Sequence, residues 1–168
     1  MRSPLLYLKN VFVVGLKKIR YMSKFSAGII QTFDKLHVEI HGSGKVKLGS
    51  YNQNRGNLYL VADGGEIIIG NHCFFNTGTC ISSTEQIIIG DNCKIGNNVV
   101  IVDHDHNFKN DGENEFISSK IEIGNGTWIG ANVTILRGTK IGANAVIGAG
   151  CVIKGEVSEG EKVIQKRV

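Results

Sequence analysis

Aliphatic residues recur along this chain with a period of six. Between residues 123 and 153 the series is uninterrupted: Ile123, Ile129, Ile135, Ile141, Ile147 and Ile153. An α-helix would bring apolar residues back every 3.6 positions and a flat strand every second position, so neither element explains this spacing. Three such repeats make a coil of about 18 residues whose aliphatic side chains stack on those of the next coil. The pattern therefore predicts an all-β fold, a parallel β-helix.

The residues that follow each aliphatic position are typical of tight turns. Glycine, asparagine and aspartate gather there, as in Gly90-Asp91-Asn92 and Gly124-Asn125-Gly126, and they tolerate a positive φ at low steric cost. The 22 glycines of the chain are thereby explained. Gly148-Ala149-Gly150 does not indicate a nucleotide-binding loop, which would need a strand, a helix and a distant acidic residue.

Length and composition indicate one repeat domain with short additions at both ends. The chain has 168 residues, of which 42% are apolar and 20% are charged, so it can bury a continuous core. Its single proline, Pro4, lies outside the repeats, as expected for stacked strands whose N–H groups all have partners. We expect the β-helix domain to span residues 36–158 and a C-terminal tail to span residues 159–168.

The N-terminal segment, residues 1–35, accounts for the net positive charge of the chain. It carries seven Lys or Arg against one acidic residue, whereas the whole chain carries 19 against 15. Residues 5–20 are apolar with interspersed cations, and Lys9 and Asn10 interrupt any run long enough to cross a bilayer. A basic amphipathic helix is predicted. It could cap the open end of the β-helix or lie on an anionic membrane surface, and the sequence leaves both possibilities open.

The four cysteines indicate neither a disulfide framework nor a metal site. Cys73, Cys93 and Cys151 each lie four residues after an aliphatic position, where a small buried side chain is expected, and no Cys-x-x-Cys pair occurs. Free thiols are typical of a reducing cytoplasm. We therefore predict a cytoplasmic protein, with possible peripheral contact at the inner face of the membrane.

The repeats are interrupted at one place. After Ile101 the next aliphatic position would be residue 107, but residues 107–120 are polar and lack the period, so a protruding loop is predicted. Directly before it stand Asp103, His104, Asp105 and His106. Two imidazoles beside two carboxylates are candidates for general acid or base chemistry.

These features resemble the left-handed β-helix acyltransferases, and among them the galactoside, maltose and polysaccharide O-acetyltransferases. The likeness covers about residues 45–155 and is most specific at Asn125-Gly126-Thr127-Trp128-Ile129-Gly130, downstream of the histidine-bearing loop. It implies a left-handed coil, acetyl-CoA as donor, no metal, and a homotrimer with active sites between adjacent subunits.

The resemblance also implies roles for individual residues. Counting forward from Ile89 assigns the catalytic base to His106, whereas counting back from Trp128 assigns it to His104; the forward count is preferred because it does not cross the loop. Asp103, Asp105, Glu113 or Glu115 could orient the ring.

The resemblance further assigns residues to the oxyanion, the acceptor and the cofactor. The backbone N–H of Ala131 would stabilise the oxyanion, and Asn76, with Asp103 near the base, would contact the acceptor. The positions that match the cofactor-binding residues are Trp128, Gly130, Ala131, Ala149 and Lys154, although the Gly-x-Pro-Ala turn usual near the C-terminus is missing.

The predicted activity is transfer of an acetyl group from acetyl-CoA to a sugar hydroxyl, in the biosynthesis of a surface polysaccharide. The acceptor would be a sugar, an oligosaccharide or a nucleotide sugar, and no nucleic-acid partner is expected. One alternative is N-acetylation of an amino sugar. Less favoured are a metal enzyme of the γ-class carbonic anhydrase type, which would need His72 beside His104 and His106, and a non-catalytic β-helix with a binding surface.

Overall fold

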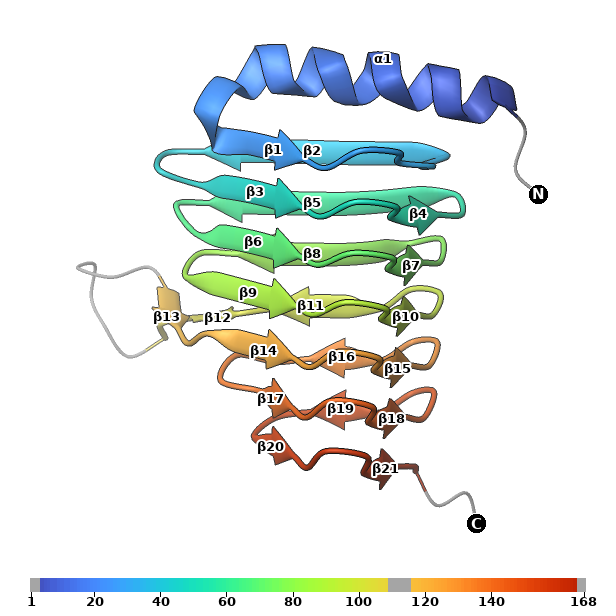
Figure 1. Ribbon diagram of the computed structural model, residues 1–168. Coiled ribbons are helices and arrows are strands. Elements are labelled where there is room, and N and C mark those ends of the chain that lie inside the picture. The colour runs from blue at the N-terminus through green and yellow to red at the C-terminus, as the bar shows by residue number, and fades with distance from the viewer. Residues whose placement is uncertain (1–3, 109–115, 166–168) are drawn as a thin grey trace.

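The computed structural model describes residues 4–108 and 116–165. They form a parallel β-solenoid of three sheets, with one helix, α1 (Pro4–Tyr21), across its N-terminal end (Figure 1). A short 3-10 helix, Met22–Lys24, links α1 to the first strand. The period of six is thus confirmed as the repeat of a solenoid, while the left hand of the coil stays a prediction.

The chain visits the three sheets in the same order in each coil. The first sheet contains β1 (Phe25–Ala27), β3 (Lys45–Leu48), β6 (Glu66–Ile69), β9 (Gln86–Ile89), β14 (Ile121–Ile123), β17 (Lys140–Ile141) and β20 (Glu156–Val157). The second contains β4 (Gln53–Asn54), β7 (Phe74–Phe75), β10 (Lys94–Ile95), β15 (Trp128–Ile129), β18 (Val146–Ile147) and β21 (Lys162–Val163). The third contains β2 (Lys35–His41), β5 (Asn57–Asp63), β8 (Thr79–Ser83), β11 (Val100–Val102), β16 (Thr134–Ile135) and β19 (Val152–Ile153).

The aliphatic residues of successive coils lie directly above one another in the core. Ile95 pairs with Ile129, which pairs with Ile147, and all three side chains are buried. The same stacking joins the isoleucines of the other two sheets. Since each buried isoleucine contributes about 1.5–3 kcal/mol relative to an exposed one, these columns supply the main stabilisation of the fold.

The turns carry the backbone conformation that the sequence predicts. Asn92 and Asn144 have φ values of 59° and 58°, and Gly126 has 69°. In the coils nearest the N-terminus the bulky Tyr51 and His72 take the equivalent place, with φ values of 60° and 57°. Their rings stack at 4.8 Å between centroids.

The solenoid extends further at both ends than the sequence indicates. Strand β1 begins at Phe25, within the segment expected to precede the repeats, because Phe25 and Ala27 are buried against β3. At the other end, β21 pairs with β18 inside the expected tail. Both extensions follow from the same requirement, since each coil offers an edge on which another strand can pair.

Helix α1 packs on the open edge of the first coil. The Asn10 side chain is buried there: its amide nitrogen donates to the Phe33 carbonyl at 3.0 Å, and its amide oxygen accepts from the Phe33 N–H at 3.0 Å. The Tyr21 hydroxyl donates to the Val38 carbonyl at 2.7 Å, and the Lys9 ammonium donates to the Asp34 carbonyl at 2.8 Å. The helix therefore supplies, through side chains, the partners that a further coil would supply through its backbone.

The cysteines are all free thiols. Cys73 and Cys93 stack in successive coils, and hydrogen bonding between them and burial raise the pKa of the Cys73 thiol, so it stays protonated. Within residues 4–108 and 116–165 no helix is long and apolar enough to cross a bilayer.

We expect Asn10→Ala to lower the free energy of unfolding by roughly 2–3 kcal/mol, because it leaves the buried N–H and C=O of Phe33 without partners. Urea denaturation would measure the change. Lys18→Ala, on the same helix, serves as control and should change stability by less than about 0.5 kcal/mol. Equal stability of the two variants would contradict the capping role of Asn10.

Candidate active site

The stack is interrupted after β11, where the chain leaves the solenoid as a hairpin. Strands β12 (His104–His106) and β13 (Phe116–Ser118) pair antiparallel, with His104 opposite Ser118 and His106 opposite Phe116 (Figure 1). The excursion thus begins at His104, earlier than the expected loop of residues 107–120, and the chain rejoins the stack at Ile121 in β14. Residues 109–115, which include Glu113 and Glu115, lie outside the described residues.

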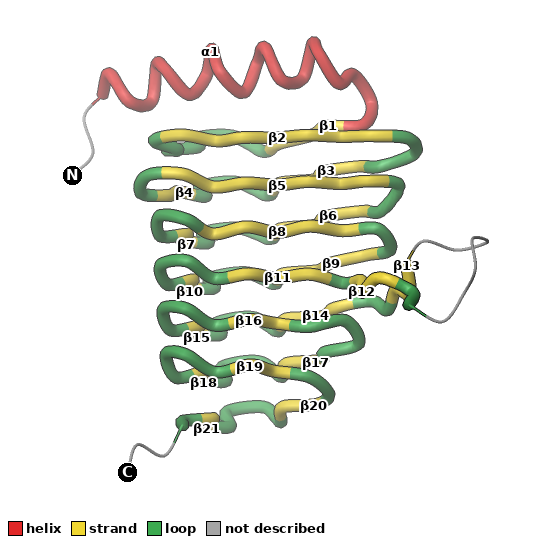
Figure 2. The backbone as a smooth tube through the Cα atoms, turned by 180° about the vertical axis from the view of Figure 1, so that it is seen from behind, coloured by secondary structure: helices red, strands yellow, loops and turns green. Residues whose placement is uncertain are grey.

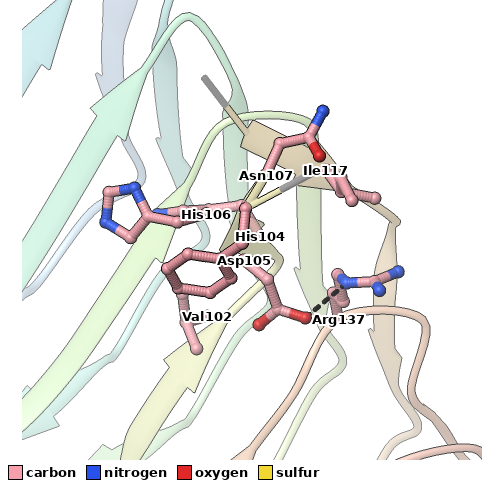
Figure 3. Close-up of a pocket in the computed structure, with 8 residues that line it drawn as sticks. Val102, His104, Asp105, His106, Asn107, Ile117 and Arg137 are labelled. Carbon is pink, nitrogen blue, oxygen red and sulfur yellow. Dashed lines mark hydrogen bonds and ion pairs between the residues drawn. The ribbon is translucent and has the colours of Figure 1, made fainter. Parts of the chain in front are cut away.

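A cleft of about 700 Å³ lies against this hairpin (Figure 3). It is lined by both histidines of the cluster and by residues from the hairpin and the next coil: Val102, His104, Asp105, His106, Asn107, Phe108, Ile117 and Arg137. The hairpin, β11 and the turn after β16 position these side chains.

Asp103 anchors the root of the hairpin. Its carboxylate is completely buried and accepts hydrogen bonds from the N–H groups of Thr84 and Glu85, at 2.8 and 3.0 Å. It also accepts from the hydroxyl groups of Ser83 and Thr84, at 2.7 and 3.3 Å. A carboxylate with this many donors is held in one orientation. These hydrogen bonds replace those that burial takes away from water.

A fifth hydrogen bond joins the Asp103 carboxylate to the imidazole of His104. Nδ1 of His104 lies 3.1 Å from the Asp103 carboxylate, and the His104 side chain is 15% exposed. Because an ionised carboxylate only accepts hydrogen bonds, Nδ1 must carry the proton, which leaves Nε2 of the neutral ring with its lone pair. The edge of the ring also contacts Phe116, at 4.9 Å between centroids. The pair has the arrangement of an oriented general base.

His106 occupies the same side of β12, two residues further on, but its environment differs. It is exposed, and its ring lies 4.9 Å from that of Phe116 and 6.3 Å from that of Phe108. Within the described part of the chain, no carboxylate forms an ion pair with it. Among the described residues, the geometry therefore provides an orienting partner for His104 and none for His106.

Arg137 enters the cleft from the next coil. Its Nε donates to the Asp105 carboxylate at 2.6 Å (Figure 3), and both side chains are partly exposed. Asp105 is therefore paired with a guanidinium, and among the described residues it forms no hydrogen bond with either histidine. Arg137 was not among the residues predicted from the sequence. It is an arginine at a turn position that is elsewhere in the regular C-terminal repeats alanine, asparagine or glycine, and this difference could have drawn attention to it.

Apart from Lys154, the residues predicted to bind the cofactor lie towards the opposite edge of the third sheet. Trp128 is on β15, and Gly130, Ala131 and Ala149 lie in the turns between the second and third sheets. The Asn132 N–H donates to the Asn97 carbonyl, so the Ala131 turn stacks on residue 97. From there the chain passes through the turn at Asn98 and along β11 before it reaches His104, so the Ala131 turn and His104 lie at opposite edges of the third sheet.

Other predicted residues divide between these two edges. Asn76 lies in the turn between β7 and β8, on the Ala131 side, where its side chain accepts a hydrogen bond from the Thr77 N–H at 3.0 Å. Lys154 follows β19 and is exposed on the His104 side, two coils further on. The structure of one chain therefore brings together His104, His106 and Asp103, but neither Asn76 nor Ala131 lies with them.

Among the described residues, no group of three His, Cys, Asp or Glu side chains is placed to hold a metal ion. His72, which a zinc site would require, instead stacks on Tyr51 and lines a different hollow with Tyr7, Arg55 and Phe74.

Two stretches of the chain match known families. Residues 120–155 match the bacterial transferase hexapeptide family (six repeats), and residues 66–102 match the hexapeptide repeat of succinyl-transferase. No curated protein sequence matches the chain.

Solved structures with the same fold include several acyltransferases. A hexapeptide-repeat acetyltransferase from Vibrio cholerae, complexed with acetyl coenzyme A, is 22% identical over 89% of this chain and 69% of its own, with a TM-score of 0.58. Galactoside acetyltransferase in complex with coenzyme A is 21% identical over 93% and 74%, with a TM-score of 0.53. The N-acyltransferase AntD from Bacillus cereus, in complex with dTDP and 3-hydroxybutyryl-CoA, is 18% identical over 86% and 79%, with a TM-score of 0.65.

We expect Asp103→Ala to lower the free energy of unfolding by roughly 2–4 kcal/mol, since it leaves the Thr84 and Glu85 N–H groups without an acceptor. The matched control is Asp105→Ala, which removes only a partly exposed ion pair and should cost less than about 1 kcal/mol. Thermal unfolding of both variants tests this. Similar melting temperatures would show that the Asp103 network does not hold the hairpin root.

Proposed function

We propose that this protein is an acetyl-CoA-dependent O-acetyltransferase that modifies a sugar hydroxyl. The matches of residues 66–102 and 120–155 to transferase hexapeptide repeats support this proposal. The observation that carries the proposal is the Asp103–His104 pair beside an open cleft. The bound ligands of the neighbouring structures, acetyl-CoA and coenzyme A, support the choice of donor.

His104 is the proposed general base. A sugar hydroxyl is a weak nucleophile at neutral pH, so its proton must be removed as its oxygen attacks the thioester carbonyl. Nε2 of His104 accepts that proton, and the Asp103 carboxylate stabilises the resulting imidazolium through Nδ1–H. The proton then passes to the departing thiolate. Since the hydroxyl attacks directly, no covalent acyl-enzyme is needed. The geometry favours His104 over His106, which is exposed and contacts aromatic rings.

The Ala131 turn is the proposed donor site. Within the described residues the Ala131 N–H donates no hydrogen bond to the chain, so it is available to an oxyanion. Gly130 and Ala149 are small residues on neighbouring turns, which would let a pantetheine arm approach the backbone, and Trp128 is exposed beside them. Lys154, at the other edge, is a candidate for a phosphate of the cofactor.

The separation of base and donor site within one chain supports a homotrimer. A complete site would need the His104 edge of one subunit next to the Ala131 edge of another, which a cyclic arrangement of side-by-side solenoids provides. Asn76 would then reach the cleft of a neighbouring subunit together with Ala131. In this arrangement a monomer would be inactive.

The acceptor is proposed to be the sugar of a surface polysaccharide or its precursor. The cleft offers the Arg137 guanidinium, the Asp105 carboxylate and the His106 ring, which suit the hydroxyl groups and the ring faces of a sugar. N-acylation of an amino sugar on a nucleotide is the second candidate, because AntD has also been crystallised with dTDP-4-amino-4,6-dideoxyglucose and coenzyme A. A histidine base would serve either reaction.

The test is acetyl-CoA turnover, followed as release of free thiol, with panels of sugars, amino sugars and nucleotide sugars. His104→Ala should reduce acceptor-dependent turnover by at least ~100-fold, the usual scale for a general base. His106→Ala, the matched control two residues away, should reduce it by less than about 10-fold. The reverse order would assign the base to His106. Failure of the protein to bind acetyl-CoA would contradict the transferase function itself.

A further inference from the structure

Helix α1 presents an apolar face that points away from the solenoid. Leu5, Leu8, Phe12, Leu16 and Ile19 follow one another at intervals of three or four residues, and each is between 50% and 75% exposed. The opposite side of the helix, with Asn10, Val14 and Tyr21, contacts the first coil. The packing of the helix on the solenoid therefore leaves its more apolar side in water. We call these five residues the outer face of α1.

Both views place α1 at one end of the molecule. In Figures 1 and 2, α1 lies beyond the first coil, and no other described element covers it. The candidate active site lies several coils away, on the side of the solenoid. The outer face thus belongs neither to the core nor to the cleft, and a contiguous exposed apolar strip of this kind usually marks an interaction site.

The charges around the outer face are all positive. The helix contains Lys9, Lys17, Lys18 and Arg20 and no acidic residue. At 100° per residue, Lys9 and Arg20 lie along one edge of the outer face and Lys18 lies towards the other. Burial and the neighbouring Arg20 lower the pKa of Lys17, which lies towards the solenoid. There Glu39 of the first coil lines a hollow with Lys17 and Arg20, on the side of the helix away from the outer face.

We propose that the outer face of α1 docks the protein on an anionic membrane surface. Its five apolar side chains would enter the boundary between headgroups and acyl chains, while the flanking cations contact anionic headgroups. A second copy of the chain fits less well, because apposed outer faces would bring the cations of both helices together without a carboxylate between them. Docking in this way would hold the axis of the solenoid roughly perpendicular to the membrane plane. The cleft on the side of the solenoid would remain open to solvent.

Vesicle flotation tests the proposal. The full chain should float with vesicles of phosphatidylcholine containing about a quarter phosphatidylglycerol, but with phosphatidylcholine alone it should bind roughly tenfold less. Raising the salt from about 50 to about 500 mM should weaken the binding, since headgroup attraction is screened. Absence of binding to the anionic vesicles would overturn the proposal.

Two variants separate the apolar and the electrostatic contributions. L8Q/F12Q/I19Q should lose binding by roughly tenfold or more, and K18E/R20E should lose it although its outer face is intact. V152Q/I164Q, which removes exposed apolar side chains remote from α1, is the matched control and should bind like the wild type. Unchanged flotation of both α1 variants would overturn the proposal.

Two further readouts keep this inference separate from the proposed activity. All variants should retain turnover of acetyl-CoA with a water-soluble acceptor, because α1 does not contact the cleft. Light scattering after gel filtration should give the same subunit number for every variant. If L8Q/F12Q/I19Q instead changed the subunit number and left flotation unaltered, the outer face would be a contact between copies, and membrane docking would be wrong.

Discussion

The architecture depends on one constraint: each coil of the solenoid must find hydrogen-bond partners for its backbone on the coils above and below. Within the stack the parallel ladders meet this requirement, and the isoleucine columns hold the coils in register. Where a neighbouring coil is missing, side chains take its place. Asn10 does so at the first coil by pairing with both backbone groups of Phe33. Asp103 does so where the chain leaves the stack, by accepting the N–H groups of Thr84 and Glu85.

The Asp103 carboxylate, which takes the place of a neighbouring coil, also creates the chemistry of the candidate site. A carboxylate buried to satisfy backbone N–H groups is rigid, and the residue that follows it, His104, is placed so that Nδ1 meets the same carboxylate. The hairpin of β12 and β13 then carries His104 to the side of the solenoid and opens the cleft beside it. The interruption of the repeat is therefore the source of the site: without it, the Asp103 position would be an ordinary corner of a coil.

The sequence was sufficient to predict the solenoid, because a six-residue aliphatic period has no other structural explanation. It was also sufficient to locate the candidate site, because the longest interruption of the period lies there. It could not distinguish His104 from His106. Residues two apart on a strand share a face, so both rings line the cleft and both contact Phe116. The distinction lies in which ring reaches the Asp103 carboxylate, and this depends on where the hairpin begins. Arg137 was missed because its partner Asp105 lies 32 positions earlier in the chain, a pairing that no local pattern reveals.

The central claim is that a working site joins the His104 edge of one subunit to the Ala131 edge of the next. Two inactive variants test it most directly: His104→Ala, which removes the base, and Ala131→Trp, whose bulk blocks the donor turn. They are mixed, unfolded and refolded together. If sites lie between subunits, about a quarter of the sites in a 1:1 mixture combine an intact His104 with an intact Ala131, and turnover should return to about that fraction of the wild-type level. Turnover that remains at the level of the separate variants would show that each site is built from a single chain and would contradict the account.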